Sequence, residues 1–162
     1  MKQTVHIAVL VLGVLLLNSC GKDSSCFKGT GNIIVEERAI TSDILNVRVA
    51  DNIDLVITQN SKASLKLQGG ENLLPYVESD ISGTELNLYS ENKCGFFRDY
   101  NKPLVAYLSL PNIEHLIIEG RGTVSNTNQL NFEVFKIDAY NATGSVNLSV
   151  NANKLEVRQH TG

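Results

Sequence analysis

Three similar phrases recur in the last third of the chain, at residues 116–124, 137–146 and 155–162. Each begins with apolar residues two positions apart, which lie on one face of an extended strand. A polar turn follows, and a glycine lies in or directly after it. The phrases return at intervals of roughly 18–22 residues, the period of a stacked β-coil whose single coils cannot bury an apolar face alone. The repeats therefore predict the rungs of a β-solenoid.

The region upstream, residues 45–110, has the alternating pattern of half-buried strands. Apolar residues alternate over 45–49, Asp51 and Asn52 interrupt the run, and alternation resumes over 53–57, which predicts two strands around a tight corner. Further strands are predicted around residues 65–67, 86–88 and 104–110. In the last of these, either the odd-numbered or the even-numbered residues face inward. Residues 73–77 form either a short helical turn or a strand interrupted by Pro75. Because no segment keeps a 3.6-residue period, the fold class expected is all-β.

The composition fits one globular domain and argues against nucleic-acid binding. Of the 162 residues, 43% are hydrophobic and 19% are charged, which is ordinary for a chain that buries a core. The formal net charge is −3, from 14 basic and 17 acidic residues. The sequence contains no run of basic residues, so we expect no nucleic-acid partner.

The N-terminus has the features of a lipoprotein signal peptide. Lys2 gives a positive start, and residues 7–17 form an apolar run too short to span a bilayer as a helix. The run ends in Leu17-Asn18-Ser19-Cys20, which resembles the lipobox of bacterial lipoproteins. We expect residues 1–19 to be removed and Cys20 to be lipidated, with acyl chains that hold the protein on a membrane. The alternative is an ordinary secretory signal cut elsewhere.

Residues 20–25 are predicted to be the lipidated cysteine and a short polar tether. Lys22 and Asp23 resemble the surface-export signal of Bacteroidetes lipoproteins, although this chain has one acid where that signal has a cluster. The localisation expected is the cell envelope, lipid-anchored at the outer membrane. Both the surface-exposed and the periplasmic face of that membrane stay open.

The other two cysteines, Cys26 and Cys94, are a candidate disulfide. An exported protein enters an oxidising compartment, where one bridge between them can form. It would close a loop of roughly 70 residues and add about 4 kcal/mol of stability in the chain-entropy model. The alternative is a pair of free thiols whose Cα atoms lie too far apart.

The longest insertion without alternation, residues 91–103, is the candidate binding loop. It contains Phe96, Phe97, Arg98 and Tyr100. Aromatic and arginine side chains on a loop are residue types that binding sites use, and a surface glycan or a protein is the partner expected. The alternative is that the two phenylalanines plug an end of the solenoid while Cys94 pins the loop.

The repeats indicate no catalytic site, no metal site and no cofactor. Stacking the phrases predicts that Asp138 lies above Glu156 in one outward column, about 4.8 Å away, as part of a solvated acidic face. Calcium takes six to eight oxygen ligands, so two carboxylates fall short of a site. His115 and His160 have no matching nucleophile motif and are expected at the surface.

The order of these features resembles the head GIN domain of auto-transporter adhesins, which is common in Bacteroidetes lipoproteins. The lipobox is followed by a Cys-Phe-x-x-x-Gly start at Cys26, by Arg38, by the alternating run over residues 47–59, and by repeats of Leu-x-Ile-x-Gly-x-Gly-x-Val type. The resemblance covers roughly residues 26–162. It implies a right-handed parallel β-helix-like domain, adhesion as the role and no catalytic residues. Such domains usually carry more repeats, so the resemblance also implies a partial copy whose open β-edge invites pairing with another chain.

Together these features predict a membrane-anchored lipoprotein with a non-catalytic β-solenoid domain that serves adhesion or surface interaction. Two alternatives remain. One is a carbohydrate-active β-helix similar to polysaccharide lyases, and the other is a purely structural envelope protein.

Overall fold

The computed structural model describes residues 29–91 and 103–161, which form two six-stranded sheets. The all-β prediction is confirmed, and the described residues contain no α-helix. The predicted signal peptide and tether lie outside the described residues. The strands are β1 (Ile33–Arg38), β2 (Asn46–Asp51), β3 (Ile53–Gln59), β4 (Ser64–Gly70), β5 (Val77–Ser82), β6 (Glu85–Ser90), β7 (Leu104–Leu110), β8 (His115–Gly120), β9 (Val124–Asn126), β10 (Leu130–Tyr140), β11 (Val146–Asn147) and β12 (Val150–His160).

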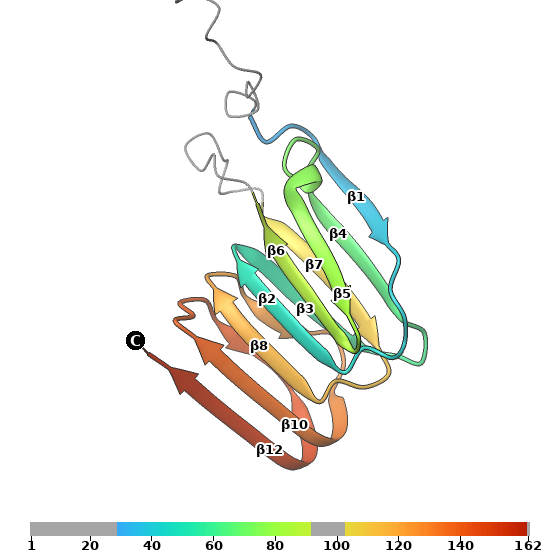
Figure 1. Cartoon of the computed structure of the whole chain (residues 1–162), viewed down its shortest axis with the longest axis vertical. Coiled ribbons are helices and arrows are strands. Elements are labelled where there is room, and N and C mark those ends of the chain that lie inside the picture. Colours follow the sequence, from blue (N-terminus) through green and yellow to red (C-terminus); the bar gives the residue numbers. More distant parts are fainter. Residues whose placement is uncertain (1–28, 92–102, 162) are drawn as a thin grey trace, which may run out of the picture.

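The two sheets lie one behind the other, as Figure 1 shows. Sheet A has the order β1-β4-β7-β3-β9-β11, and sheet B has the order β12-β10-β8-β2-β6-β5. From β6 to β12, consecutive strands alternate between the sheets, and so do β2 and β3. Each pair of consecutive strands therefore contributes one strand to each layer, and the β2–β3 pair lies between the β6–β7 and β8–β9 pairs.

Parallel pairing dominates the stack, with antiparallel pairing confined to one end. Strands β2, β3 and β6 to β12 pair with one another in parallel. The pairs β1–β4, β4–β7 and β5–β6 are antiparallel. The hairpin β5–β6 turns at Gly83, whose φ of 59° suits a tight connection that only antiparallel strands can use. Both sheets are therefore mixed.

One hydrophobic core lies between the sheets, supplied by alternate residues of both. On β2 and β3 the buried positions are the apolar residues of the predicted alternation, such as Val47 and Leu55. On β7 the even-numbered set faces inward, because Leu104, Ala106 and Leu108 are buried. Of the two alternatives for residues 73–77, the structure has a short 3-10 helix over Leu74–Tyr76. No helix in residues 29–91 and 103–161 has the length and apolar character needed to cross a membrane.

Tight corners connect the strands of sheet B to those of sheet A, and the corners stack on one another. Asp51 and Asn141 turn with φ values of 60° and 49°. The backbone N–H of Arg121 donates to the carbonyl of Asp51 (2.7 Å), and that of Thr143 donates to the carbonyl of Gly120 (2.9 Å). Backbone hydrogen bonds therefore join the corners of neighbouring coils.

The apolar core thins out between β10 and the second half of β12. Phe135 and Ile137 on β10 are paired in register with Leu155 and Val157 on β12. The first two are buried, whereas Leu155 is 51% exposed and Val157 is 64% exposed. The last strand is therefore uncovered at Leu155 and Val157, whereas Val150 and Ala152 near its start still pack against the core.

Candidate functional site

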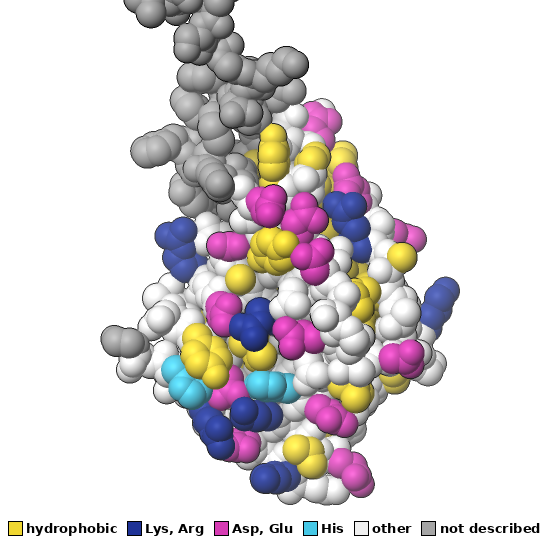
Figure 2. All heavy atoms as spheres, in the orientation of Figure 1, with side chains coloured by type: hydrophobic (Ala, Val, Ile, Leu, Met, Phe, Trp, Pro, Cys, Tyr) yellow, Lys and Arg dark blue, Asp and Glu magenta, His cyan; other side chains and the backbone are white. Residues whose placement is uncertain are grey.

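The outer face of sheet B carries an ordered array of polar side chains. Residues that alternate with the buried set point outward on each strand, and parallel registers align them across neighbouring strands. His115, Lys136 and Glu156 form one row, and Ile117, Asp138 and Arg158 form the next. Figure 2 shows this face, with the histidine side chains over the lower strands beside lysine and arginine side chains, and with a cluster of acidic side chains over the upper strands.

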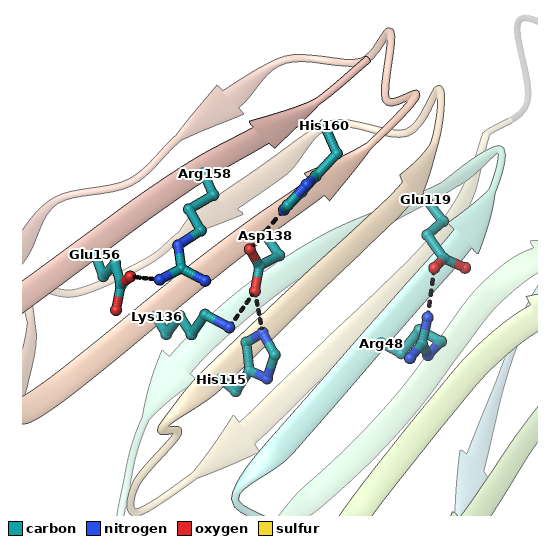
Figure 3. Close-up of polar contacts among 8 residues, drawn as sticks. All are labelled: Arg48, His115, Glu119, Lys136, Asp138, Glu156, Arg158 and His160. Carbon is teal, nitrogen blue, oxygen red and sulfur yellow. Dashed lines mark hydrogen bonds and ion pairs between the residues drawn. The ribbon is translucent and has the colours of Figure 1, made fainter. Parts of the chain in front are cut away.

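Asp138 on β10 is the centre of this array. Its Oδ2 lies 2.7 Å from Nε2 of His115 on β8 and 2.7 Å from Nζ of Lys136, while its Oδ1 lies 2.9 Å from Nε2 of His160 on β12. Figure 3 shows the three side chains converging on the carboxylate. One carboxylate thus joins three adjacent strands on their outer face.

The environment of Asp138 favours its charged form. Its side chain is only 1% exposed because its three partners cover it, although it lies on the outer face of a sheet and not between the layers. The hydrogen bonds from Lys136 and His160 lower the pKa of Asp138 well below its usual range, and those effects outweigh the opposing effect of desolvation. Because an ionised carboxylate only accepts hydrogen bonds, each imidazole donates from Nε2. A carboxyl group of such low basicity is poorly suited to act as a general base near neutral pH.

His160 makes a second contact that fixes the end of β12. Its ring stacks on that of Tyr140, with centroids 4.2 Å apart and planes inclined by 8°. The two residues are directly paired across β10 and β12. The stack therefore supports the Asp138–His160 hydrogen bond and holds the two strands in register.

Charged pairs continue along the same face. Arg48 on β2 pairs with Glu119 on β8, and its Nε lies 3.6 Å from Oε1 of Glu85 on β6. Arg158 pairs with Glu156 on β12. Each of these side chains is at least one-third exposed, so the pairs contribute little stability, at most about 1 kcal/mol each. They leave the face polar, hydrogen-bonding and mixed in charge.

The far end of the face, on β5 and β6, is acidic. The hydroxyl of Tyr89 donates to Oδ2 of Asp80 at 2.7 Å. This hydrogen bond, assisted by desolvation and the nearby carboxylates, raises the pKa of Tyr89 to about 12. The face therefore changes along the stack, from carboxylates around Tyr89 to the His, Lys and Arg side chains around Asp138.

The predicted column of Asp138 above Glu156 is wrong. In the structure Asp138 is paired with Arg158, and Glu156 is paired with Lys136. Each carboxylate therefore lies beside a cation, and Asp138 is buried instead of solvated. The real register differs from the predicted one by two residues, which leaves the same side chains facing outward.

His115 and His160 are half-buried, and their role as partners of Asp138 was not predicted. Their separations from Asp138 in sequence, 23 and 22 residues, are close to one repeat of the coil. Because residues one repeat apart lie on neighbouring strands of a coil, this spacing could have predicted that both histidines lie near Asp138.

The other predicted site residues fall within residues 1–28 and 92–102. Cys20, the candidate disulfide Cys26–Cys94, and Phe96, Phe97, Arg98 and Tyr100 of the candidate loop all lie outside the described residues. Within residues 29–91 and 103–161, no group of three or more His, Cys, Asp or Glu side chains is arranged to hold a metal ion.

Several solved structures share this fold. A "putative adhesin" from Bacteroides fragilis matches with a TM-score of 0.67 and 19% identity over 79% of this chain and 58% of its own. A "putative adhesin" from Parabacteroides merdae has a TM-score of 0.68 and 21% identity over 81% and 54%, respectively. A "putative lipid binding protein" from Parabacteroides distasonis has a TM-score of 0.63 and 21% identity over 76% and 52%. This chain thus spans little more than half the length of these proteins.

Sequence comparison gives the family directly. No match was found among curated proteins. The sequence profile of the family described as "Putative auto-transporter adhesin, head GIN domain" matches residues 45–162. That segment includes the corner at Asp51, the three repeats and every residue around Asp138, so the predicted resemblance is confirmed. The chain belongs to this head GIN domain family.

Proposed function

We propose that this protein is a lipid-anchored, non-catalytic adhesion module of the cell envelope, which presents the outer face of sheet B to a surface glycan or a protein. The family match over residues 45–162 is the observation that carries the proposal. The outer face supports it, since its exposed side chains pair with one another instead of converging on a pocket. Asp138, the most sheltered acid on that face, is already occupied by three donors.

The proposal includes a coil geometry. Strands β8 and β10 are parallel neighbours in sheet B, and β9 in sheet A lies between them in sequence. Crossovers between parallel strands of one sheet are right-handed in about 98% of cases. We therefore assign a right-handed β-helical path to β8–β12. An experimental structure would test this through the hand of the β8–β9–β10 connection.

Membrane attachment follows from the proposed lipidation of Cys20. In cell fractionation, Cys20→Ala should move the protein from the membrane fraction to the soluble fraction, because the acyl chains would be lost. Cys26→Ala is the matched control and should stay with the membrane. Membrane retention of Cys20→Ala would refute the anchor. Protease treatment of intact cells would then separate surface display from a periplasmic location, the two faces left open at the outer membrane.

Glycan binding is the direct test of the adhesive role. The full-length protein would be applied to an array of surface polysaccharides, and both retention and release of shortened chains would be measured. Binding without shortening supports the proposal. Depolymerisation would favour a polysaccharide lyase-like enzyme, and the absence of both, with no protein partner captured from the cell surface, would favour a purely structural envelope protein.

Two variants would locate the binding surface. Lys154→Glu reverses the charge of an exposed side chain on β12 of sheet B, and Arg98→Glu does the same in the candidate loop. Loss of binding in the first variant alone assigns binding to the sheet. Loss in the second alone assigns it to the loop of residues 91–103 and contradicts the proposed surface.

A further inference from the structure

A hollow opens at the corner of the coil where β8 and β10 begin (Figure 1). Its volume is about 420 Å³, within the range of about 300–1,000 Å³ that small-ligand sites occupy. One wall is formed from residues 111–114, which lead into β8, and the other from residues 131–134 at the start of β10. Because β8 and β10 both have strand neighbours on either side, the hollow does not depend on an edge of the sheet.

A bend in β10 shapes one wall. Inward-facing positions are buried up to Phe132 and again from Phe135, while Glu133 and Val134 between them are both exposed. In a regular strand, successive side chains point to opposite faces, so one of two such neighbours would face the core. The bend therefore presents a carboxylate and an apolar side chain together in the hollow.

Gln59, the last residue of β3, holds the two walls in place. Its Nε2 donates to the carbonyl oxygens of Pro111 (3.1 Å) and Asn131 (2.8 Å), and its Oε1 accepts from the backbone N–H of Asn131 (2.7 Å). One side chain thus ties residues 111–114 to residues 131–134. A site that is held in shape before binding loses little conformational freedom when a ligand enters.

Three polar side chains that line the hollow have hydrogen-bonding capacity to spare. Glu114 and Glu133 are exposed and Asn112 is half-buried. Within residues 29–91 and 103–161, none of these three side chains forms a hydrogen bond or an ion pair. The two carboxylates only accept hydrogen bonds, whereas the amide of Asn112 both donates and accepts. The hollow therefore suits a ligand with several donors and at least one acceptor.

We propose that this hollow binds one saccharide unit of a surface glycan. The proposal rests on the adhesive function proposed above and gives the glycan a definite site, at the corner that borders the outer face of sheet B. Sugar hydroxyls would donate to Glu114 and Glu133 and exchange hydrogen bonds with Asn112. The C–H groups of the ring would lie against Pro111 and Val134, the latter 50% exposed.

The competing ligand is a basic side chain of a partner protein, which the two negative charges would attract. Both carboxylates are exposed, however, and an ion pair between exposed groups gains little affinity and is screened by salt. A single cation would also leave the amide of Asn112 and the apolar surface of Val134 without contacts. The lining as a whole therefore favours an uncharged ligand rich in hydroxyl groups.

Isothermal titration of the full-length protein with uncharged tetrasaccharides from mannan, xylan and dextran tests the site. At least one should bind, with an affinity nearly independent of salt. Glu114→Gln and Glu133→Gln each replace an acceptor with an amide of the same shape, so each should raise the dissociation constant about tenfold. Glu37→Gln is the matched control, because it removes a carboxylate that is 75% exposed on β1 of sheet A, and it should bind as wild type does. Circular dichroism would verify that every variant keeps its strand content.

The other outcomes separate this site from the adhesive function. Saccharide binding that neither glutamate variant weakens would overturn the site and leave a glycan adhesin that binds elsewhere. Binding of a cell-surface protein but of no saccharide would overturn the site while the adhesive role stands, and binding of neither would overturn both. A basic protein that is retained through Glu114 and Glu133 and released by salt would replace the saccharide with a cationic partner.

Discussion

Asp138 ties together three neighbouring strands of sheet B, whose residues lie about one repeat apart in the sequence. Its carboxylate accepts hydrogen bonds from His115 on β8, Lys136 on β10 and His160 on β12. A buried carboxylate and its donors stabilise the fold together. Removing one member of the cluster is costly, because the remaining groups lose a hydrogen-bond partner. The residue therefore acts as a polar clamp on the outer face of sheet B.

Asp138→Asn should lower the free energy of unfolding by about 2 kcal/mol, because the amide is uncharged and presents a donor toward groups that already donate. Urea denaturation of the full-length protein at neutral pH would measure the change. Glu133→Gln removes a charge from an exposed position on the same strand and is the matched control. Its unfolding free energy should stay within about 0.5 kcal/mol of wild type. If Glu133→Gln lowered the free energy of unfolding as much as Asp138→Asn, the effect would come from the loss of any negative charge on the strand and not from the contacts of Asp138.

The lowered pKa of Asp138 also predicts a pH dependence. An acid whose pKa is depressed by folding contributes stability that is complete above its unfolded pKa of about 3.9 and is lost as the pH falls toward the folded value. The stability advantage of wild type over Asp138→Asn should therefore hold near pH 5 and shrink below about pH 4. Urea midpoints of both proteins across this range would test it. An advantage that grows on acidification would contradict the assigned direction of the shift.

At the scale of the element, the stacked corners set how closely successive coils approach. A Cβ at Gly122 would overlap the carbonyl oxygen of Ile53, and one at Gly144 would overlap the carbonyl oxygen of Gly122. The three corners are therefore in backbone contact, and the glycines of the repeats are required by that close approach.

Gly122→Ala should destabilise the protein by about 1–3 kcal/mol, because the added methyl group forces the corners of neighbouring coils apart. Thermal unfolding followed by circular dichroism would report the loss. At Gly29 a Cβ would meet nothing within 4 Å, so Gly29→Ala is the control and should leave the midpoint nearly unchanged. If both variants had the same thermal midpoint, the corners of neighbouring coils could move apart to admit a methyl group without loss of stability.

Strand positions were predictable, but the register between them was not. Period-two alternation located the strands around residues 45–57, 65–67 and 86–88, because one face of each is buried. A shift of two residues preserves that alternation, so sequence pattern alone could not distinguish Asp138 beside Glu156 from Asp138 beside Arg158. The contacts of the two histidines with Asp138 were not predictable for the same reason, since their proximity depends on the register. The antiparallel end of the stack also lay beyond the repeat pattern, which describes only residues 116–162.

At the scale of the whole molecule, the core between the sheets is the main source of stability, and it thins out along the last strand. Phe135 is fully buried and contacts Phe132 at a centroid distance of 5.1 Å, whereas its neighbour in register, Leu155, is half-exposed. Inward-facing side chains that are paired in register are thus buried on β10 but half-exposed on β12.

Phe135→Ala should cost about 3–5 kcal/mol of unfolding free energy, because it leaves a cavity between the sheets. Leu155→Ala should cost less than about 1 kcal/mol in dilute protein, since its side chain is half in water already. Urea denaturation at low concentration would compare them. Similar losses in the two variants would mean that the core extends to β12 in solution.

The order of strands has a consequence for how the chain acquires its structure. The segment containing β2 and β3 is made early, yet it lies in the middle of both sheets, between β8–β9 on one side and β6–β7 on the other. It gains its two neighbours only after residues 85–126 have been synthesised, so the stack cannot assemble one layer at a time from the N-terminus. Such distant pairings close large loops and are slow to form. We therefore expect β2 and β3 to be completed last on one side, when the strands of residues 104–126 reach them, even though they precede those strands in the chain.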